Sequence, residues 1–274
     1  MNPDKKSISV ELQGGLGNQL FGWAAGFALS KKMNLDLTLN TSNLIARRYE
    51  LDAFRLSEKV KLSNTKESRI RRINLADNSF EEKSFQYDKR FEYISKPKRL
   101  KGYFQSWKYF DDYKSEIQSL LYLKQESNEL RLLSEMTSAY QVLGVHIRRG
   151  DYVGLENYHG LTSSRYFKNA VQMIQKLSGF EKIMVFSDDI AVAREVFPQG
   201  DYYISSQELD SSPETLILMS RCKSFIGSNS SFSWWAGYIG SRHSEFRIFP
   251  RPWFTNPSID SRDLLPPNWI TLGI

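Results

Sequence analysis

The sequence has a single cysteine, Cys222, and only three histidines among its 274 residues. One cysteine excludes an internal disulfide and suits a reducing compartment. No apolar run is long enough to span a bilayer, because the stretch from Leu20 to Leu29 is followed closely by two lysines. Residues 1–12 lack the apolar core of a secretory signal, and no repeat or low-complexity segment is visible. We therefore expect a cytoplasmic protein that is at most peripheral to the inner face of a membrane.

The chain has fewer acidic residues than basic ones: 31 aspartates and glutamates against 37 lysines and arginines, which gives a formal net charge of +6. A basic surface of this kind fits a nucleotide, an anionic membrane surface or nucleic acid. Part of the excess lies in short runs at 47–48, 69–72 and 96–101, and such runs are usually solvated faces. We expect no nucleic-acid partner, and peripheral membrane contact stays an alternative.

Strands alternate with helices through most of the chain, which predicts an α/β fold with doubly wound parallel sheets and helices on both faces. The segment 125–137 is either another helix or a charged connector, and a boundary placed there predicts two domains, 1–135 and 136–274. The polar stretch 41–100 has weak periodicity and predicts no clear elements. The expected strands are 8–12, 35–39, 142–147, 182–186, 202–204, 224–226 and 246–249; the expected helices are 18–32, 110–124, 164–177, 190–196 and 212–222, with Asn18 and Ser212 as caps.

The strand 142–147 carries His146 and is followed at once by two arginines, Arg148 and Arg149. Adjacent arginines beside a buried strand are costly without an anionic partner, and the planar guanidinium suits the oxygens of a phosphate. Asp151 follows Gly150, and we expect it to brace the arginine loop. These residues predict a phosphate-bearing ligand at the carboxyl edge of a sheet.

Two further strands of the second half end in polar clusters, and ligands of open α/β sheets bind outside the carboxyl ends of strands. After 224–226 come Asn229, Ser230 and Ser231 at the start of an expected helix, where backbone N–H groups and hydroxyls bind anions; simple helix capping is the alternative. After 182–186 come Asp188 and Asp189. Their adjacent carboxylates suit a divalent metal, recognition of guanine or a helix cap, but they lack the Asp-x-Asp spacing of metal-dependent glycosyltransferases.

The turn from Gly14 to Gln19 is similar to the dinucleotide fingerprint Gly-x-Gly-x-x-Gly. Leu20 stands where the third glycine belongs, which counts against an NAD site, although an NAD(P)-dependent oxidoreductase stays an alternative. Gly15 and Gly17 still let the backbone approach a ligand, and Asn18 offers a donor to a leaving phosphate. An ordinary strand-to-helix turn is the other interpretation.

Four motifs resemble the α-1,2-fucosyltransferases of glycosyltransferase family 11, and the resemblance is weakest over 41–100. They are Gly-Gly-Leu-Gly-Asn-Gln-Leu-Phe at 14–21, His-Ile-Arg-Arg-Gly-Asp-Tyr at 146–152, Phe-Ser-Asp-Asp at 186–189 and Asn-Ser-Ser-Phe-Ser-Trp-Trp at 229–235. The resemblance implies a GT-B-like fold of two Rossmann-type domains facing a cleft. It also implies GDP-β-L-fucose as donor, a galactose-terminated oligosaccharide as acceptor, inversion at the anomeric carbon, and no metal or other cofactor.

Carried over by position, the resemblance assigns the donor site to both halves of the chain. His146 would contact guanine or ribose, and Arg148 would contact the β-phosphate as a catalytic group. Arg149 is open between a second phosphate contact and a structural ion pair. The remaining donor contacts would be Asp188 or Asp189 on guanine, Asn229, Ser230, Ser231 and the Phe232 backbone on the diphosphate, and Gly15, Gly17 and the catalytic Asn18 from the first domain.

A general base would take the proton from the acceptor 2-hydroxyl, if the loose transition state needs one. His159 titrates near neutral pH and is the preferred candidate, while Glu11 and Asp151 are alternatives. Another nucleotide-sugar transferase of the same fold is the runner-up function, and a non-catalytic glycan-binding or nucleic-acid-binding module is a third class.

Overall fold

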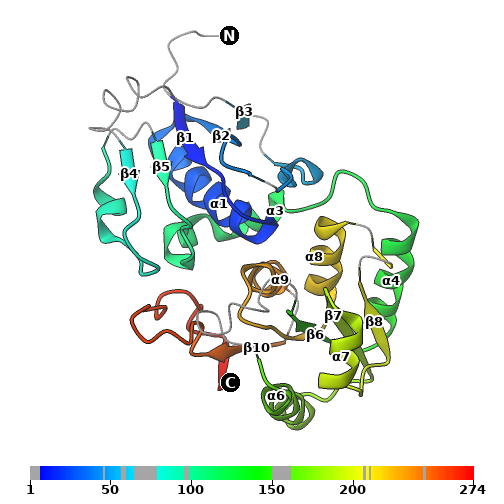
Figure 1. The fold of residues 1–274 in the computed structure, drawn as a ribbon. Coiled ribbons are helices and arrows are strands. Elements are labelled where there is room, and N and C mark those ends of the chain that lie inside the picture. Colours follow the sequence, from blue (N-terminus) through cyan, green and yellow to red (C-terminus); the bar gives the residue numbers. More distant parts are fainter. Residues whose placement is uncertain are drawn as a thin grey trace. The chain divides into compact units, whose positions relative to one another are not determined.

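The computed structural model describes residues 7–45, 47–56, 60–64, 79–95, 99–149, 162–205, 208–209, 211–242 and 245–274. The chain divides into two compact units (Figure 1). Unit 1 comprises Met1–Tyr122 and Arg262–Leu265, and unit 2 comprises Leu123–Ser261 and Pro266–Ile274. Within the described residues, no helix is long and apolar enough to cross a membrane.

The first division falls after Tyr122, earlier than the boundary at residue 135 that the sequence suggests. Helix α4 (Asn128–Ala139) accounts for the difference, because it packs against α8 (Ser212–Arg221) of unit 2. The backbone N–H and the hydroxyl of Ser127, the cap of α4, donate to the carboxylate of Glu214 at 2.6 and 2.8 Å. The segment is therefore a helix of unit 2 and not a connector.

Unit 1 contains a five-stranded parallel sheet in the order β3-β2-β1-β5-β4. The sequence predicts β1 and β2 but not the other three. The missed strands are short, and β3 and β4 lie at the edges with mostly exposed side chains, so they leave no apolar pattern. The strands are β1 (Ser7–Glu11), β2 (Asp36–Asn40), β3 (Val60–Ser63), β4 (Ser79–Glu81) and β5 (Arg99–Lys101).

Helix α1 (Leu16–Met33) is buried along almost its whole length against this sheet. A Cβ at Gly26 would collide with Val10 Cγ2, so the helix packs on β1 at a distance that only glycine allows. Its N-cap is Gly15, and the expectation that Asn18 caps it is wrong, because Asn18 already lies in the first turn.

The helix expected over 110–124 is shorter in the structure. It begins as the 3₁₀ turn η5 (Asp111–Tyr113), continues as α3 (Lys114–Leu120) and ends there. The described residues of unit 1 also contain the 3₁₀ turns η1 (Leu51–Ala53), η3 (Lys89–Tyr93) and η4 (Trp107–Tyr109).

Unit 2 contains a six-stranded parallel sheet in the order β11-β10-β9-β6-β7-β8. Its predicted strands and helices match the structure closely, except that Ser211 and not Ser212 caps α8 and that the sequence does not predict β11. The elements are β6 (Val142–Ile147), α6 (Ser164–Leu177), β7 (Lys182–Ser187), α7 (Ile190–Val196), β8 (Tyr202–Ile204), β9 (Ser224–Ile226), α9 (Ser231–Gly240), β10 (Phe246–Arg251) and β11 (Ile270–Gly273).

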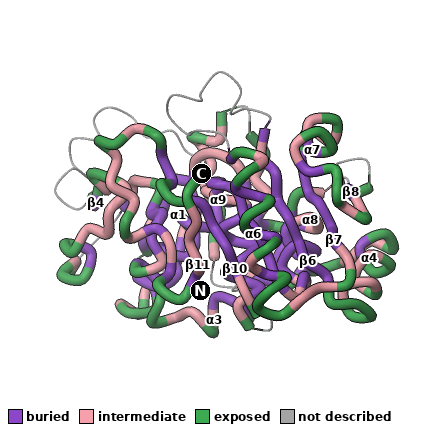
Figure 2. Tube along the Cα trace, turned by 90° about the horizontal axis from the view of Figure 1, so that it is seen from below, coloured by how far each residue is buried: buried purple, intermediate pink, exposed green. Residues whose placement is uncertain are grey.

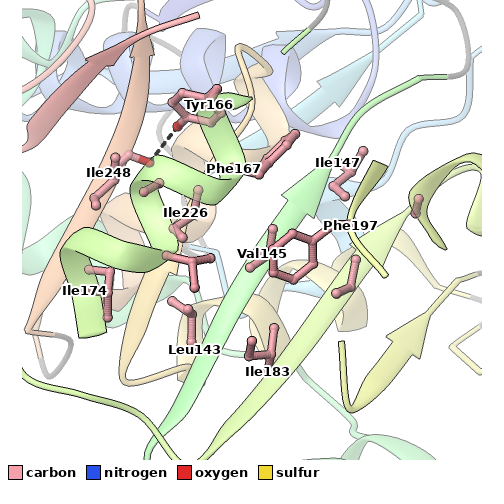
Figure 3. Packing of buried hydrophobic residues seen from close by; sticks show 14 of the residues in the cluster. Leu143, Val145, Ile147, Tyr166, Phe167, Ile174, Ile183, Phe197, Ile226 and Ile248 are labelled. Carbon is pink, nitrogen blue, oxygen red and sulfur yellow. Dashed lines mark hydrogen bonds between the residues drawn. The ribbon is translucent and has the colours of Figure 1, made fainter. Parts of the chain in front are cut away.

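The core of unit 2 lies between this sheet and the helices that cover it. Every residue of β6 is buried, and so is every residue of β7 after Lys182, as Figure 2 shows in purple. Tyr166 on α6 is 1% exposed, and its hydroxyl donates to the carbonyl of Gly227 at 2.7 Å and lies 3.3 Å from that of Ile248 (Figure 3). These contacts tie α6 to β10 and to the residue that follows β9.

Each sheet has a point where the direction of strand addition reverses. In unit 2 the chain runs from β6 outward through β7 to β8 and then returns to place β9 on the other side of β6. In unit 1 it runs from β1 through β2 to β3 and returns to place β5 beside β1. Ligands of open parallel sheets bind at the carboxyl ends of strands at such switch points, so both pairs of strand ends are candidate sites.

Candidate functional site

The three polar clusters predicted for unit 2 follow neighbouring strands, in the order β9, β6, β7. Hydrogen bonds join the clusters in pairs. His146 on β6 contacts Ser228 beyond β9, and Arg148 beyond β6 contacts Asp188 beyond β7. The Ser187 hydroxyl also donates to the carbonyl of Ile147 at 2.8 Å. The structure therefore brings the clusters together at the switch point of the sheet.

His146 is 4% exposed, and its Nδ1 lies 2.9 Å from Ser233 Oγ and 3.1 Å from Ser228 Oγ. Burial, assisted by the positive charge of Arg148, lowers the pKa of His146 to about 3. The imidazole is therefore neutral at physiological pH. A neutral ring suits a nucleoside hydroxyl or base edge better than a phosphate.

Arg148 forms an ion pair with Asp188, with Nη1 2.8 Å from Oδ2. Both side chains remain about a quarter exposed, at 26% and 24%. The carboxylate holds the guanidinium at the strand end while part of it stays accessible. Arg148 thus presents a positive charge to solvent at this edge of the sheet.

Arg149 has a different environment, although it is the next residue. Its side chain is buried, its Nη2 donates to the Thr162 carbonyl at 3.0 Å, and its backbone N–H donates to Asp188 Oδ1 at 2.9 Å. Burial lowers the pKa of Arg149, and the nearby Asp188 partly opposes this effect. The guanidinium lies inside the protein, which favours a structural role over a second phosphate contact.

Asp188 and Asp189 have different partners, although the sequence suggested the same roles for both. Asp188 accepts from Arg148 and from the backbone of Arg149. Asp189 caps α7, and its Oδ1 accepts from the N–H of Val192 at 3.1 Å. In the part of the chain that the structure describes, no group of three or more histidine, cysteine or acidic side chains is placed to hold a metal ion.

The serine cluster surrounds the start of α9. Ser230 is the N-cap and accepts from the N–H of Phe232, whereas Asn229 is 2% exposed and donates to the Trp253 carbonyl at 3.2 Å. Ser231 and Phe232, the first two residues of the helix, are partly exposed. The helix dipole and the N–H groups of this first turn make it suitable for an anion.

In unit 1 the glycine-rich turn follows β1, and Gly14 has a φ of +71°. Gly15 lies open, since a Cβ there would have no atom within 4 Å. Asn18 is partly exposed, and its Oδ1 accepts from Gln105 Nε2 at 2.8 Å. Gly17 is buried as the second residue of α1. The turn and Gln105, which follows β5, meet at the switch point of this sheet.

The three candidates for the general base differ in what the structure says of them. His159 and Asp151 lie outside the described residues. Glu11, at the end of β1, is buried, pairs with Arg99 and accepts from Asn43 Nδ2 at 3.1 Å. A carboxylate with two such partners is a poor proton acceptor, which counts against Glu11.

The sequence analysis assigns no individual role to several residues that shape these strand ends. Gln19 is fully buried; its amide donates to the carbonyls of Gly14 and Arg48 and accepts from the N–H of Glu50. The Gln105 side chain donates to Asn18, and the backbone carbonyl of Thr162 accepts from Arg149. Arg48 lies 29 residues from Gln19, and Gln105 lies 87 residues from Asn18, so no local pattern points to these partners.

Comparison with known proteins adds family and fold. The profile described as "Glycosyl transferase family 11" matches residues 1–273. An alpha-1,2-colitosyltransferase of Escherichia coli is 30% identical over 97% of this chain and 98% of its own length. The O-antigen biosynthesis glycosyltransferase WbnK of Escherichia coli is 29% identical over 95% and 99%. Galactoside alpha-(1,2)-fucosyltransferase 2 of Oryctolagus cuniculus is 27% identical over 86% and 68%.

Among solved structures, a mutant of FUT1 from Arabidopsis thaliana in complex with GDP superimposes with a TM-score of 0.52. The superposition covers 88% of this chain and 69% of that one at 12% sequence identity. At this identity the likeness establishes the fold alone. It confirms the predicted GT-B-like α/β architecture with two parallel sheets flanked by helices.

Proposed function

Because the chain belongs to glycosyl transferase family 11, we propose that it transfers L-fucose from GDP-β-L-fucose to the 2-hydroxyl of a β-galactoside, with inversion and without a metal. The product would carry an α-1,2 linkage. Relatives named for α-1,2 transfer of colitose and of fucose support the linkage. The GDP complex of the FUT1 mutant supports a GDP-linked donor.

The observation that carries the proposal is the placement of Arg148 at the end of β6, beside β9, the strand whose end leads into α9. As the sugar leaves with oxocarbenium character, negative charge grows on the β-phosphate of GDP. Arg148, fixed by Asp188, and the positive end of the α9 helix dipole are preorganised to stabilise this charge. Preorganised groups of this kind supply the largest part of many rate enhancements.

The remaining polar groups fit the nucleoside. His146 is neutral and offers its ring for a hydrogen bond with ribose or guanine. Both oxygens of Asp188 are used by the arginines, whereas Asp189 gives only Oδ1 to the cap of α7, so Oδ2 of Asp189 is the better candidate to accept from guanine. Asn18 in unit 1 would donate to a substrate oxygen. His159 stays a predicted base.

A colitosyl donor is the second candidate, because the E. coli relative at 30% identity is named for it. Fucose and colitose differ only by the hydroxyl at carbon 3. A pocket that hydrogen-bonds this hydroxyl rejects the deoxy sugar strongly, whereas an apolar pocket discriminates little. We expect a higher kcat/KM with GDP-fucose than with GDP-colitose, and the reverse order would assign the protein to colitose transfer.

The deciding experiment incubates the protein with GDP-fucose and a panel of β-galactosides and determines the linkage of the product by NMR. We expect Arg148→Ala to lower kcat/KM by at least about a thousandfold, because it removes a charge used in the transition state. Arg131→Ala is a matched control, since Arg131 is exposed on α4. Turnover of Arg148→Ala similar to that of the control would contradict the proposal.

A further inference from the structure

The switch point of unit 1 contains a contact that the proposed function does not use. Gln105, which follows β5, donates from Nε2 to Oδ1 of Asn18 in the first turn of α1, at 2.8 Å. We propose that Gln105 is a positioning residue: it fixes the amide of Asn18 so that the Nδ2 N–H groups are offered to a substrate oxygen. This inference rests on the proposed function, because it takes Asn18 as a substrate contact.

The Asn18 amide is confined from two sides. On one side Gln105 holds Oδ1. On the other side Nδ2 lies over Gly14, where a Cβ would come within 2.5 Å of it. A side chain at position 14 would therefore displace the amide, and the positive φ of Gly14 also favours glycine. The turn is built to keep the Asn18 amide in one orientation.

Gln105 is itself held firmly by the turn that follows β5. It is 8% exposed, and the two residues before it, Tyr103 and Phe104, donate their N–H groups to one oxygen of Glu82 at 2.9 and 2.8 Å. Gly102 has a φ of +149°, and a Cβ there would lie 2.5 Å from the Glu82 Cβ. The carboxylate of Glu82 thus organises the turn that delivers Gln105.

The chemistry of the pair decides what Asn18 can offer. An amide nitrogen only donates and an amide oxygen only accepts. Because Oδ1 receives the N–H of Gln105, the group left to face a ligand is Nδ2, a donor suited to a phosphate or hydroxyl oxygen. A glutamate at position 105 would reverse this arrangement. When ionised it only accepts, so Asn18 would turn Nδ2 toward it and present Oδ1 to the substrate.

The test compares Asn18→Ala, Gln105→Ala, Gln105→Glu and the double variant Asn18→Ala/Gln105→Glu. We expect kcat/KM for the donor substrate to fall about tenfold in Gln105→Ala. In Gln105→Glu we expect a fall of about a hundredfold, because Asn18 would then present Oδ1 instead of Nδ2 to the substrate oxygen. In the Asn18→Ala background the Gln105→Glu change should add less than about threefold. Gln118→Glu, at another buried glutamine of unit 1, is the control for introducing a carboxylate.

The pH dependence separates positioning from a merely structural role. Protonation of the carboxylate introduced by Gln105→Glu restores a donor for Asn18 Oδ1, so the activity of this variant relative to wild type should rise as the pH falls. The ratio for Gln105→Ala should stay level. Melting temperatures of all variants confirm that they are folded.

Three results would overturn the inference: equal losses in Gln105→Glu and Gln105→Ala, an undiminished loss in the Asn18→Ala background, or full activity of Asn18→Ala itself. The first two results leave the proposed function intact, and full activity of Asn18→Ala would remove only Asn18 from its substrate contacts. Failure of the proposed function is seen separately, as wild-type protein that does not transfer fucose from GDP-fucose. In that event the same comparison is made on the affinity for GDP by calorimetry, where the same order of losses supports the inference and equal affinities contradict it.

Discussion

The neutral, buried His146 makes the protein sensitive to acid in a way that one substitution can reveal. The pKa of His146 is lowered from 6.5 to about 3 by burial. Between about pH 3 and pH 6.5 the folded state therefore binds fewer protons than the unfolded state. The stability that a neutral histidine allows is fully present above pH 6.5 and is lost as the pH falls toward 3.

The size of the effect follows from these two values. At pH 5 the unfolded histidine is almost entirely protonated, while the folded one is almost entirely neutral. Linkage then lowers the free energy of unfolding by about 2 kcal/mol relative to pH 8. His146→Asn removes the titrating group, and the amide can still approach the hydroxyls of Ser228 and Ser233 that now contact Nδ1.

The assay is urea unfolding of wild type and His146→Asn at pH 5 and pH 8. The sequence has only three histidines, and the other two are present in both proteins, so their contributions largely cancel. We expect wild type to lose about 2 kcal/mol more than the variant over this range. Equal losses would refute a neutral His146 in the folded state and, with it, the assignment to an uncharged part of the donor.

Four further predictions concern the two turns of unit 1 and the metal requirement. Gly15→Ala should fold normally, because its Cβ meets no atom, yet lower transfer if a substrate approaches this backbone; Gly14→Ala should cost about 1–2 kcal/mol in stability through its positive φ. An undiminished kcat/KM in Gly15→Ala would remove it from the donor site. Burial raises the pKa of Glu82 to about 7, so wild type should lose stability as the pH rises from 4.5 through 7, by up to about 3 kcal/mol. Glu82→Gln should lack this loss, and a matching pH profile in chemical denaturation would contradict it. Transfer should persist in EDTA; loss of activity that Mn²⁺ or Mg²⁺ restores would show a metal requirement.

The fold of unit 2 could be predicted from the sequence because its strands are buried on both faces. The run 142–147 is apolar apart from His146 and glycine, and the helix 164–177 shows the spacing of an amphipathic helix, so β6 and α6 match the structure residue for residue. Strand β3 of unit 1 lies at a sheet edge and buries almost nothing. It therefore carries no apolar signal, and its place is decided by pairing with β2.

For the site, too, the sequence predicts features that depend on local patterns but not contacts between residues far apart in the chain. Convergence of three strand ends could be predicted, because parallel strands that neighbour one another end at the same edge. The individual partners could not. Ser233 lies 87 residues from His146, and Gln105 lies 87 residues from Asn18. The Arg149 side chain points into the protein, where it donates to the Thr162 carbonyl, and no sequence motif predicts this contact.

The short segment 262–265 has a consequence for recombining relatives of this protein. It lies deep in the second half of the sequence but belongs to unit 1, where the backbone carbonyl of Asp263 accepts from the Ser106 hydroxyl and its carboxylate accepts from the N–H of Tyr87. The boundary between the units is therefore crossed three times by the chain, and a single junction near residue 122 does not separate them. A chimera that exchanges the second half between family members should therefore keep its native 262–265 with its own first half, because these four residues complete unit 1.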